Sequence, residues 1–392
     1  MIDSFKKFQA QTTNYPLGIE VTKAKGSYVY DRKKKYLDLV AGVSVQNLGH
    51  CNQELNKSIK NQIEKYSHVM VYGEFIQKPS LELCELLNKI LPENLNSTYL
   101  TNSGTEAIEA ALKLAKRVTG RTRIISALNS YHGSTHGSMS VSGFEQRKRA
   151  YRPLLPNIDF IKFNDEKDIE KINDDTSCVI LETIQGGAGF ILPEQNYLKK
   201  ISKRCQEVGA ILILDELQTG LGRTGKMFAF EHYGISPDIL VLGKSLGGGF
   251  PIGAMITDLS LMNKLKSNPI LGHITTFGGH PVISQAGLTT LKITLRDKLY
   301  KKAKISESKF KNRLKHPEII EIRGKGLMLA LILKSNQLAK DLVIKCLDRG
   351  LILFWLLYES KAVRITPPLN ISEKEIEISC DIIIKTLDEI GN

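Results

Sequence analysis

Residues 210–220 read AILILDELQTG, and residues 238–249 read DILVLGKSLGGG. Each stretch begins with an apolar run of the length of a buried strand. Each run passes directly into polar residues, which include Asp215 in the first stretch and Lys244 in the second. Similar runs separated by helical patterns occur earlier, at residues 97–100, 123–128, 158–163 and 178–181. Strands that alternate with helices predict an α/β fold whose mostly parallel sheet is covered by helices. Because ligands bind beyond the carboxyl ends of such strands, Asp215 and Lys244 mark a candidate site.

The chain has 392 residues, which is more than one compact core usually spans. The C-terminal part predicts a Lys-rich helix, three strands and a closing helix, at residues 289–314, 319–323, 327–333, 351–357 and 372–390. A polar turn between residues 28–31 and 35–38 predicts a hairpin. We therefore expect an N-terminal segment that packs with a small α+β domain, a large ligand-binding domain, and the small domain itself, at residues 1–45, 46–288 and 289–392.

The composition argues against several classes of function. The net charge is +13, but the basic residues are spread along the chain and no base-stacking pattern of aromatic residues accompanies them, so no nucleic-acid partner is expected. No apolar run is long enough to cross a bilayer, and residues 1–11 lack the apolar core of a secretory signal, so no membrane association is expected. The six cysteines form no CxxC or Cys/His cluster, which argues against a metal site and favours a reduced, cytoplasmic setting.

The segment from Ser103 to Glu106 has the features of an anion-binding helix start. It follows the strand predicted at 97–100, and Ser103 with Glu106 three residues later fits a capping box. Gly104 allows close approach of the backbone, and the free N–H groups of the first turn, with the hydroxyls of Ser103 and Thr105, favour an anion. Many helices begin in this way without a ligand, so this segment alone does not establish a site.

Lys244 and Asp215 supply the two groups that pyridoxal-phosphate (PLP) chemistry requires. An amine must form an imine with the cofactor and move protons, and an acid must keep the pyridine nitrogen protonated so that the ring withdraws electrons. The glycines at 247–249 let a ligand lie against bare backbone. Neither GxxxxGK[ST] nor a GxGxxG that opens a helix after a strand is present, so the glycines do not indicate a nucleotide.

Several motifs, in a fixed order from about residue 15 to the C-terminus, carry a resemblance to a known family. They are YLD at 36–38, LGH at 48–50, TNSGTEA at 101–107, YHG at 131–133, Glu182 with QG at 185–186, DELQTG at 215–220, Lys244 with its glycines, TTFGG at 275–279, RGKG at 323–326 and RITPPL at 364–369. By these motifs the chain resembles the class III aminotransferases of PLP fold type I, and within them the acetylornithine/ornithine aminotransferase group. PLP is the cofactor that this resemblance implies.

The resemblance also implies roles for individual residues. Lys244 is the lysine that holds PLP through an imine and acts as acid and base, and Asp215 pairs with the pyridine nitrogen. Gln218 reaches the ring hydroxyl, and Tyr131 stacks on the ring face. The implied phosphate ligands are Ser103, Gly104, Thr105 and, from a second subunit, Thr276. A homodimer with shared active sites follows from the last of these.

The substrate residues match the family less well. Arg364 resembles the arginine whose planar fork grips a substrate carboxylate, and Thr275 and Ser134 are the other expected substrate contacts. However, Ser134 stands where the acetylornithine and ornithine enzymes usually have an arginine, and Gly187 stands where a glutamate usually faces the C-terminal arginine. Arg364 then lacks its usual counter-charge. His132 we expect to be structural, since the resemblance gives the proton transfer to the lysine.

The resulting hypothesis is transamination of the ω-amino group of N-acetylornithine, or of a related basic amino acid, with 2-oxoglutarate. The products are an aldehyde and glutamate, in arginine or lysine-type amino-acid biosynthesis. Ornithine, succinyl-diaminopimelate or another ω-amino donor remains an alternative, as does an aminomutase of the same fold. Because Ser134 and Gly187 depart from the pattern, a degenerate homologue that serves as a binding protein is a third alternative.

Overall fold

The structure is a computed structural model, and it describes residues 1–391. Its largest sheet consists of β4 Ser97–Thr101, β5 Arg123–Ala127, β6 Ile158–Ile161, β7 Thr176–Glu182, β8 Ile211–Asp215, β9 Ile239–Gly243 and β10 Gly253–Thr257. These seven strands lie in the order β4-β10-β9-β8-β7-β5-β6. β10 runs antiparallel to β4 and β9, whereas the pairs from β9 to β6 are parallel. The expected α/β fold with a mostly parallel sheet is therefore confirmed.

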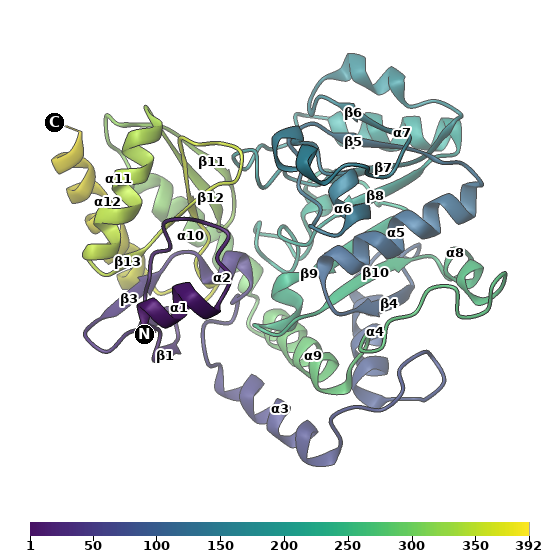
Figure 1. The fold of residues 1–392 in the computed structure, drawn as a ribbon, viewed down its shortest axis with the longest axis horizontal. Coiled ribbons are helices and arrows are strands. Elements are labelled where there is room, and N and C mark those ends of the chain that lie inside the picture. The colour runs from purple at the N-terminus through teal and green to yellow at the C-terminus, as the bar shows by residue number, and fades with distance from the viewer. Residues whose placement is uncertain (392) are drawn as a thin grey trace.

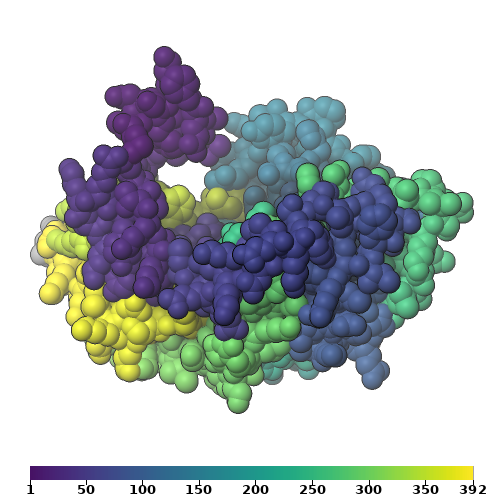
Figure 2. Space-filling view, turned by 90° about the horizontal axis from the view of Figure 1, so that it is seen from below, coloured from purple at the N-terminus to yellow at the C-terminus, as the bar shows by residue number. Residues whose placement is uncertain are grey.

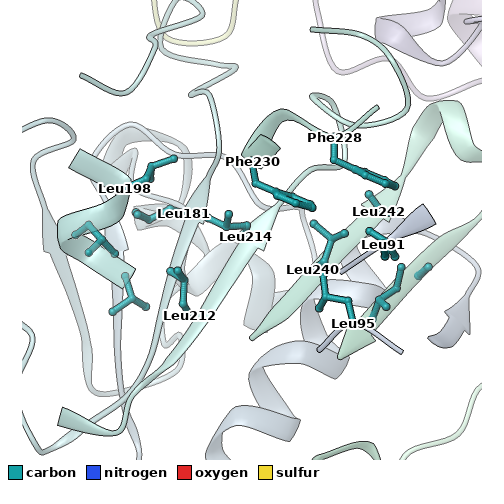
Figure 3. Packing of buried hydrophobic residues seen from close by; sticks show 14 of the residues in the cluster. Leu91, Leu95, Leu181, Leu198, Leu212, Leu214, Phe228, Phe230, Leu240 and Leu242 are labelled. Carbon is teal, nitrogen blue, oxygen red and sulfur yellow. The ribbon is translucent and has the colours of Figure 1, made fainter. Parts of the chain in front are cut away.

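Helices cover both faces of this sheet (Figure 1). They are α4 Lys78–Ile90, α5 Gly104–Thr119, α7 Tyr197–Val208 and α9 Pro281–Arg296. Successive side chains of a strand point to opposite faces. Ile213 accordingly packs in the cluster that contains α5, while Leu212 and Leu214 pack in the cluster that contains α4, α7 and α9. Figure 3 shows the second cluster, where the stacked rings of Phe228 and Phe230 lie 5.6 Å apart among strand leucines. Each fully buried leucine contributes about 1.5–3 kcal/mol.

Two four-stranded sheets accompany the large one. One has the order β1-β2-β3-β13 and consists of β1 Lys23–Lys25, β2 Tyr28–Tyr30, β3 Lys35–Asp38 and β13 Leu351–Ile352. The other has the order β11-β12-β15-β14 and consists of β11 Ile319–Lys325, β12 Met328–Leu333, β14 Phe354–Trp355 and β15 Ala362–Ile365. β2 and β3 form the predicted hairpin, and Leu37 of β3 lies opposite Leu351 of β13. Both chain ends consequently lie on one side of the molecule (Figure 2).

Two expectations for the C-terminal part are wrong. The single helix predicted over 289–314 is broken, because α9 ends at Arg296 and α10 Leu299–Arg313 begins only after Lys298 adopts a left-handed φ of 49°. The strand predicted over 351–357 is divided between β13 and β14, which belong to different sheets. The closing helix is confirmed as α12 Glu373–Ile390, with Ser372 as its N-cap.

The remaining helices connect these layers. They are α1 Ile2–Phe8, α2 Ala41–Ser44, α3 Gln53–Lys65, α6 His136–Ser140, α8 Leu259–Met262 and α11 Asn336–Asp348. Short 3-10 turns complete the list at Glu145–Arg147, Arg149–Tyr151, Glu166–Lys171, Ala229–His232, Lys244–Gly247 and Asn263–Lys266. Within residues 1–391, no helix combines the length and the hydropathy that crossing a membrane requires.

Candidate active site

Two carboxylates lie side by side at the carboxyl ends of parallel strands. Asp215 is the last residue of β8, and Glu182, the last residue of β7, lies opposite it in the sheet. Both side chains are buried. Nδ1 of His132 lies 2.8 Å from Oδ2 of Asp215, and the N–H of Leu217 donates to Oδ1 at 2.9 Å. Asp215 is therefore held on both oxygens. His132, which we expected to be structural, positions this carboxylate.

Glu182 was quoted in the motif but was not predicted as a site residue. It accepts hydrogen bonds from the N–H groups of Gly186 at 2.9 Å and Tyr131 at 3.1 Å. Burial raises its pKa to about 7; the charge of Asp215 adds to this, and His132 opposes it. The signal that could have identified Glu182 is the one that identified Asp215, since each directly follows an apolar run.

Lys244 follows β9 directly and is the first residue of a 3-10 turn. Its φ of 43° lies in the left-handed region, which is strained for a residue with a side chain. Burial lowers the pKa of its ammonium, and the charges of Asp215 and Glu182 oppose that effect. β8 and β9 are neighbouring parallel strands, so Lys244 follows the strand next to the one that ends at Asp215. The charge of Arg364 also lowers the pKa of Lys244.

The predicted anion cradle lies against the strand that carries Lys244. A Cβ on Gly243 would lie 3.7 Å from the Cα of Gly104, the first residue of α5. Ser103 caps α5 by accepting from the N–H of Glu106 at 3.3 Å. The carboxylate of Glu106, however, accepts from the N–H of Asn102 at 2.8 Å, so the reciprocal bond of the expected capping box is absent.

The first turn of α5 has donors available for an anion. Within residues 1–391, no acceptor lies in hydrogen-bond range of the N–H groups of Gly104 and Thr105. The hydroxyl of Thr105 contacts those of Ser138 at 2.6 Å and Thr135 at 2.7 Å, which orient it. Unpaired N–H groups at the start of a 16-residue helix suit a phosphate.

Tyr131 and Gln218 also reach this region. Tyr131 is partly exposed, and its backbone is fixed through Glu182. The side-chain amide of Gln218 donates to the hydroxyl of Ser44 at 3.1 Å. A Cβ on Gly186 would lie 2.7 Å from Oε1 of Gln218 and 3.1 Å from Oε1 of Glu182, so the two side chains meet beside this glycine.

Arg364 on β15 presents an unsatisfied guanidinium. The side chain is buried, and its Nε donates to the carbonyl of Trp355 at 3.3 Å. Within residues 1–391, its Nη1 has no hydrogen-bond partner. Burial lowers its pKa to about 10, which still leaves it charged at neutral pH. A buried, charged fork with a free donor is suited to a carboxylate of a ligand.

Ser134 lies between two residues that contact Thr105: a Cβ on Gly133 would lie 2.5 Å from the hydroxyl oxygen of Thr105, and the hydroxyl of Thr135 lies 2.7 Å from it. Ser134 and Thr276 are exposed, and neither has a hydrogen bond within residues 1–391. The hydroxyl of Thr275 accepts from the N–H of Gly278 at 2.9 Å. Neither Thr275 nor Thr276 is hydrogen-bonded to the cradle at Ser103 within one chain.

The assembled residues fit PLP. The N–H groups at the start of α5 suit its phosphate, Asp215 suits the pyridine nitrogen, and Lys244 supplies the amine. Within residues 1–391, no group of three or more His, Cys, Asp or Glu side chains is placed to hold a metal ion. A cavity of about 740 Å³ lies elsewhere, and its lining includes Lys226, Lys301 and Lys304 but none of the predicted site residues.

Comparisons with known proteins agree with this chemistry. The family profile of the class-III aminotransferases matches residues 8–387. Acetylornithine aminotransferase of Archaeoglobus fulgidus is 36% identical over 368 residues, which cover 93% of this chain and 95% of that protein. The LysW-aminoadipate semialdehyde/glutamate semialdehyde transaminase of Sulfurisphaera tokodaii is 34% identical and covers 96% of each chain.

A solved structure shows the same fold. It is the ornithine aminotransferase of Toxoplasma gondii, described with partial occupancy of PLP at its active site. Its TM-score is 0.91 at 28% identity, over 100% of this chain and 94% of that chain. Because the profile covers nearly the whole chain and the cradle, amine and acid lie together, the chain belongs to the class-III aminotransferase family and uses PLP as its cofactor.

Proposed function

We propose that the chain transfers the ω-amino group of N-acetylornithine, or of a related basic amino acid, to 2-oxoglutarate. The products are the corresponding aldehyde and glutamate. The observation that carries the proposal is that Lys244 and Asp215 follow or end neighbouring parallel strands, with Glu182 opposite Asp215 at the end of the next strand. Within residues 1–391, the buried Nη1 of Arg364 has no hydrogen-bond partner. The names of two relatives, an acetylornithine aminotransferase and a LysW-aminoadipate semialdehyde/glutamate semialdehyde transaminase, support donors with an ω-amino group.

The residues divide the work of the reaction. PLP, when bound, supplies a ring that withdraws electrons from the reacting carbon. Asp215, held by His132 and Leu217, keeps a negative charge where the ring nitrogen needs one. Burial lowers the pKa of Lys244, which favours the neutral amine, so its Nζ takes a proton from one carbon and returns it at another position. Arg364 binds a carboxylate of 2-oxoglutarate and orients this acceptor.

The assembly and setting are part of the same proposal. We propose a homodimer in which Thr276 of one subunit completes the phosphate site of the other. The reason is that Thr276 is exposed and makes no hydrogen bond to any of residues 1–391 of its own chain. A cytoplasmic setting suits the six cysteines, which are free thiols. The name of the Archaeoglobus relative supports arginine biosynthesis as the process.

A donor screen tests the reaction. The purified holoenzyme is supplied with N-acetylornithine, ornithine or succinyl-diaminopimelate, with and without 2-oxoglutarate, and glutamate is measured. We expect glutamate from at least one ω-amino donor, and none from the Lys244→Ala variant, which lacks the proton-transferring amine. Glutamate from no donor would overturn the proposal. Product formation that does not need 2-oxoglutarate would indicate an aminomutase instead.

A further inference from the structure

Gly187 is in direct contact with an aromatic side chain from a distant part of the sequence. A Cβ on Gly187 would lie 2.8 Å and 2.9 Å from two ring carbons of Tyr358. The N–H of Tyr358 donates to the carbonyl of Gly187 at 2.9 Å, so the two backbones are joined. Any side chain at position 187 would therefore displace the Tyr358 ring, which occupies the space that a side chain at 187 would fill.

Tyr358 is part of a continuous surface. Its ring stacks on Phe144 with centroids 4.4 Å apart and an interplanar angle of 17°. The guanidinium carbon of Arg147 lies 5.7 Å from the centroid of the same ring. We call Gly187, Tyr358, Phe144 and Arg147 the Tyr358 wall. Stacking of this kind keeps a guanidinium in place without neutralising it.

The Tyr358 wall adjoins the residues around Asp215, because Gly187 directly follows Gly186, whose N–H donates to Glu182 at 2.9 Å and on which a Cβ would lie 2.7 Å from Oε1 of Gln218. Burial raises the pKa of Tyr358, and the charge of Glu182 raises it further, while Arg147 lowers it. Arg147 also lowers the pKa of Tyr131, which burial raises. One guanidinium thus acts on both tyrosines, and Tyr131 is bonded through its backbone to Glu182. The free end of a donor that reacts near Lys244 would meet this wall.

The charges of the pocket are not balanced. Within residues 1–391, Arg147 has no ion-pair partner, and its neighbour Glu145 is bound by Arg152 at 2.8 Å. Within the same residues, the buried Nη1 of Arg364 has no hydrogen-bond partner. Of the carboxylates near Lys244, Asp215 is held by His132, and both oxygens of Glu182 accept backbone hydrogen bonds. A carboxylate at the non-reacting end of a donor would therefore find a hydrogen-bond donor here, whereas a second ammonium would meet guanidinium groups of the same charge.

We propose that the Tyr358 wall selects amino donors whose non-reacting end carries a carboxylate and no free ammonium. N-acylated diamino acids and simple ω-amino acids fit this description, whereas free diamino acids and diamines do not. Arg147 binds the carboxylate, and the rings of Phe144 and Tyr358 pack against the apolar chain. The proposal rests on the proposed transamination and specifies its substrate class.

The test compares donors that differ at the free end. N-acetylornithine is set against ornithine, and 4-aminobutyrate against putrescine, with kcat and KM measured on the holoenzyme. We expect kcat/KM to be at least about tenfold higher for the first member of each pair. Arg147→Gln should lower kcat/KM for N-acetylornithine about tenfold or more, mainly through KM, because the charged hydrogen bond to the carboxylate is lost. The same variant should raise kcat/KM for putrescine, because it removes a guanidinium that repels the free ammonium of this donor. Arg149→Gln, which removes an exposed charge two residues away, is the matched control and should change neither.

A second variant tests the space at position 187. Gly187→Glu alone should impair every donor, because the new side chain collides with Tyr358. Gly187→Glu combined with Tyr358→Ala makes room for a carboxylate and should move the preference toward ornithine about tenfold or more.

Binding of glutarate, a dicarboxylate without an amine, separates this proposal from the proposed function. Calorimetry should show binding that Arg147→Gln weakens about tenfold and Arg149→Gln does not. If no donor yields glutamate but glutarate binding behaves in this way, the transamination proposal fails and the Tyr358 wall stands as a carboxylate site. If ornithine reacts as well as N-acetylornithine, or Arg147→Gln affects all ligands equally, the selective role of the wall is wrong.

Discussion

Lys244 combines a strained backbone with a buried amine. Its φ of 43° lies in the left-handed region, and the charges of Asp215 and Glu182 oppose the lowering of its pKa by burial. The packing behind it is tight, since a Cβ on Gly243 would lie 2.6 Å from the side chain of Leu217. Strain of this kind persists only where the surroundings fix it, and it is typical of functional positions. The same environment that lowers the pKa of the amine therefore also fixes its position.

Glu182 should make the stability of the cofactor-free protein depend on pH. Its folded pKa of about 7 lies above the ordinary value of 4.5, so the folded state keeps a proton that the unfolded state releases. The proton on Glu182 makes its full contribution to the free energy of unfolding below about pH 4.5. That contribution is lost as the pH rises from about 4.5 to about 7. The upper limit of the loss is roughly 3 kcal/mol. In Glu182→Gln, unfolding midpoints at pH 5 and pH 7 should differ less than in the wild type.

The matched control is Glu64→Gln, which changes an exposed glutamate on α3. It should keep the pH dependence of the wild type. If Glu182→Gln titrates as steeply as the wild type, the elevated pKa of Glu182 is wrong.

Asp215 and Lys244 could be predicted because each follows an apolar strand, and the strand ends of a parallel sheet meet at one edge. The contact between His132 and Asp215 could not, because 83 residues separate the pair and no periodic pattern joins them. Tyr358 and Gly187 are farther apart still, and their contact depends on how the β14–β15 loop meets the large sheet. Local sequence patterns therefore indicated Asp215 and Lys244 as site residues, but they could not indicate the contact between Tyr358 and Gly187.

At the level of elements, α5 shows how far local sequence determines structure. Its N-cap Ser103, its acidic first turn and its C-terminal Gly120 with a φ of 68° all agree with the predicted helix. The break between α9 and α10 has no such signal. Asp297 and Lys298 do not mark a helix end, and Lys298 adopts a left-handed conformation without being glycine. There α9 contributes buried side chains to two hydrophobic clusters and α10 to one of them, and this tertiary packing overrides the helical pattern of the sequence.

The N-cap of α5 should affect both stability and cofactor binding. Ser103→Ala removes the oxygen that accepts from the N–H of Glu106, and such a loss costs about 1 kcal/mol of unfolding free energy. It also removes a hydroxyl from the phosphate cradle, so the dissociation constant of PLP should rise on the order of tenfold. Fluorescence titration of the cofactor-free protein measures the second effect, and denaturant unfolding measures the first.

Ser335→Ala is the matched control, because Ser335 caps α11 in the same way, accepting from the N–H of Leu338 at 3.1 Å. It should lower stability by a similar amount and leave PLP affinity unchanged. Equal losses of PLP affinity in the two variants would mean that Ser103 acts only through stability.

The whole molecule exposes apolar surface around the segment that carries Thr276. Ile270 is 77% exposed and Phe277 is 52% exposed, and Ile76 in another loop is 92% exposed. The ring of His68, from the stretch that precedes Ile76, lies 4.8 Å from that of Phe277, so the two loops meet. Large apolar side chains gathered on a surface indicate an interface. The same surface carries Thr276, which motivates a dimer with shared sites.

Complementation between two variants tests whether Thr276 serves the partner subunit. Lys244→Ala removes the amine, and Thr276→Asp places a negative charge where the phosphate of PLP should lie, so each variant alone should have little or no activity. In a mixed dimer, the subunit with intact Lys244 receives an intact Thr276 from the other subunit, and one of the two sites is complete. Random assortment after co-expression should therefore restore about a quarter of wild-type activity, since half of the dimers are mixed and each has one complete site. If Thr276 acts within its own chain, no mixed dimer contains a complete site, and co-expression should give no more activity than either variant alone.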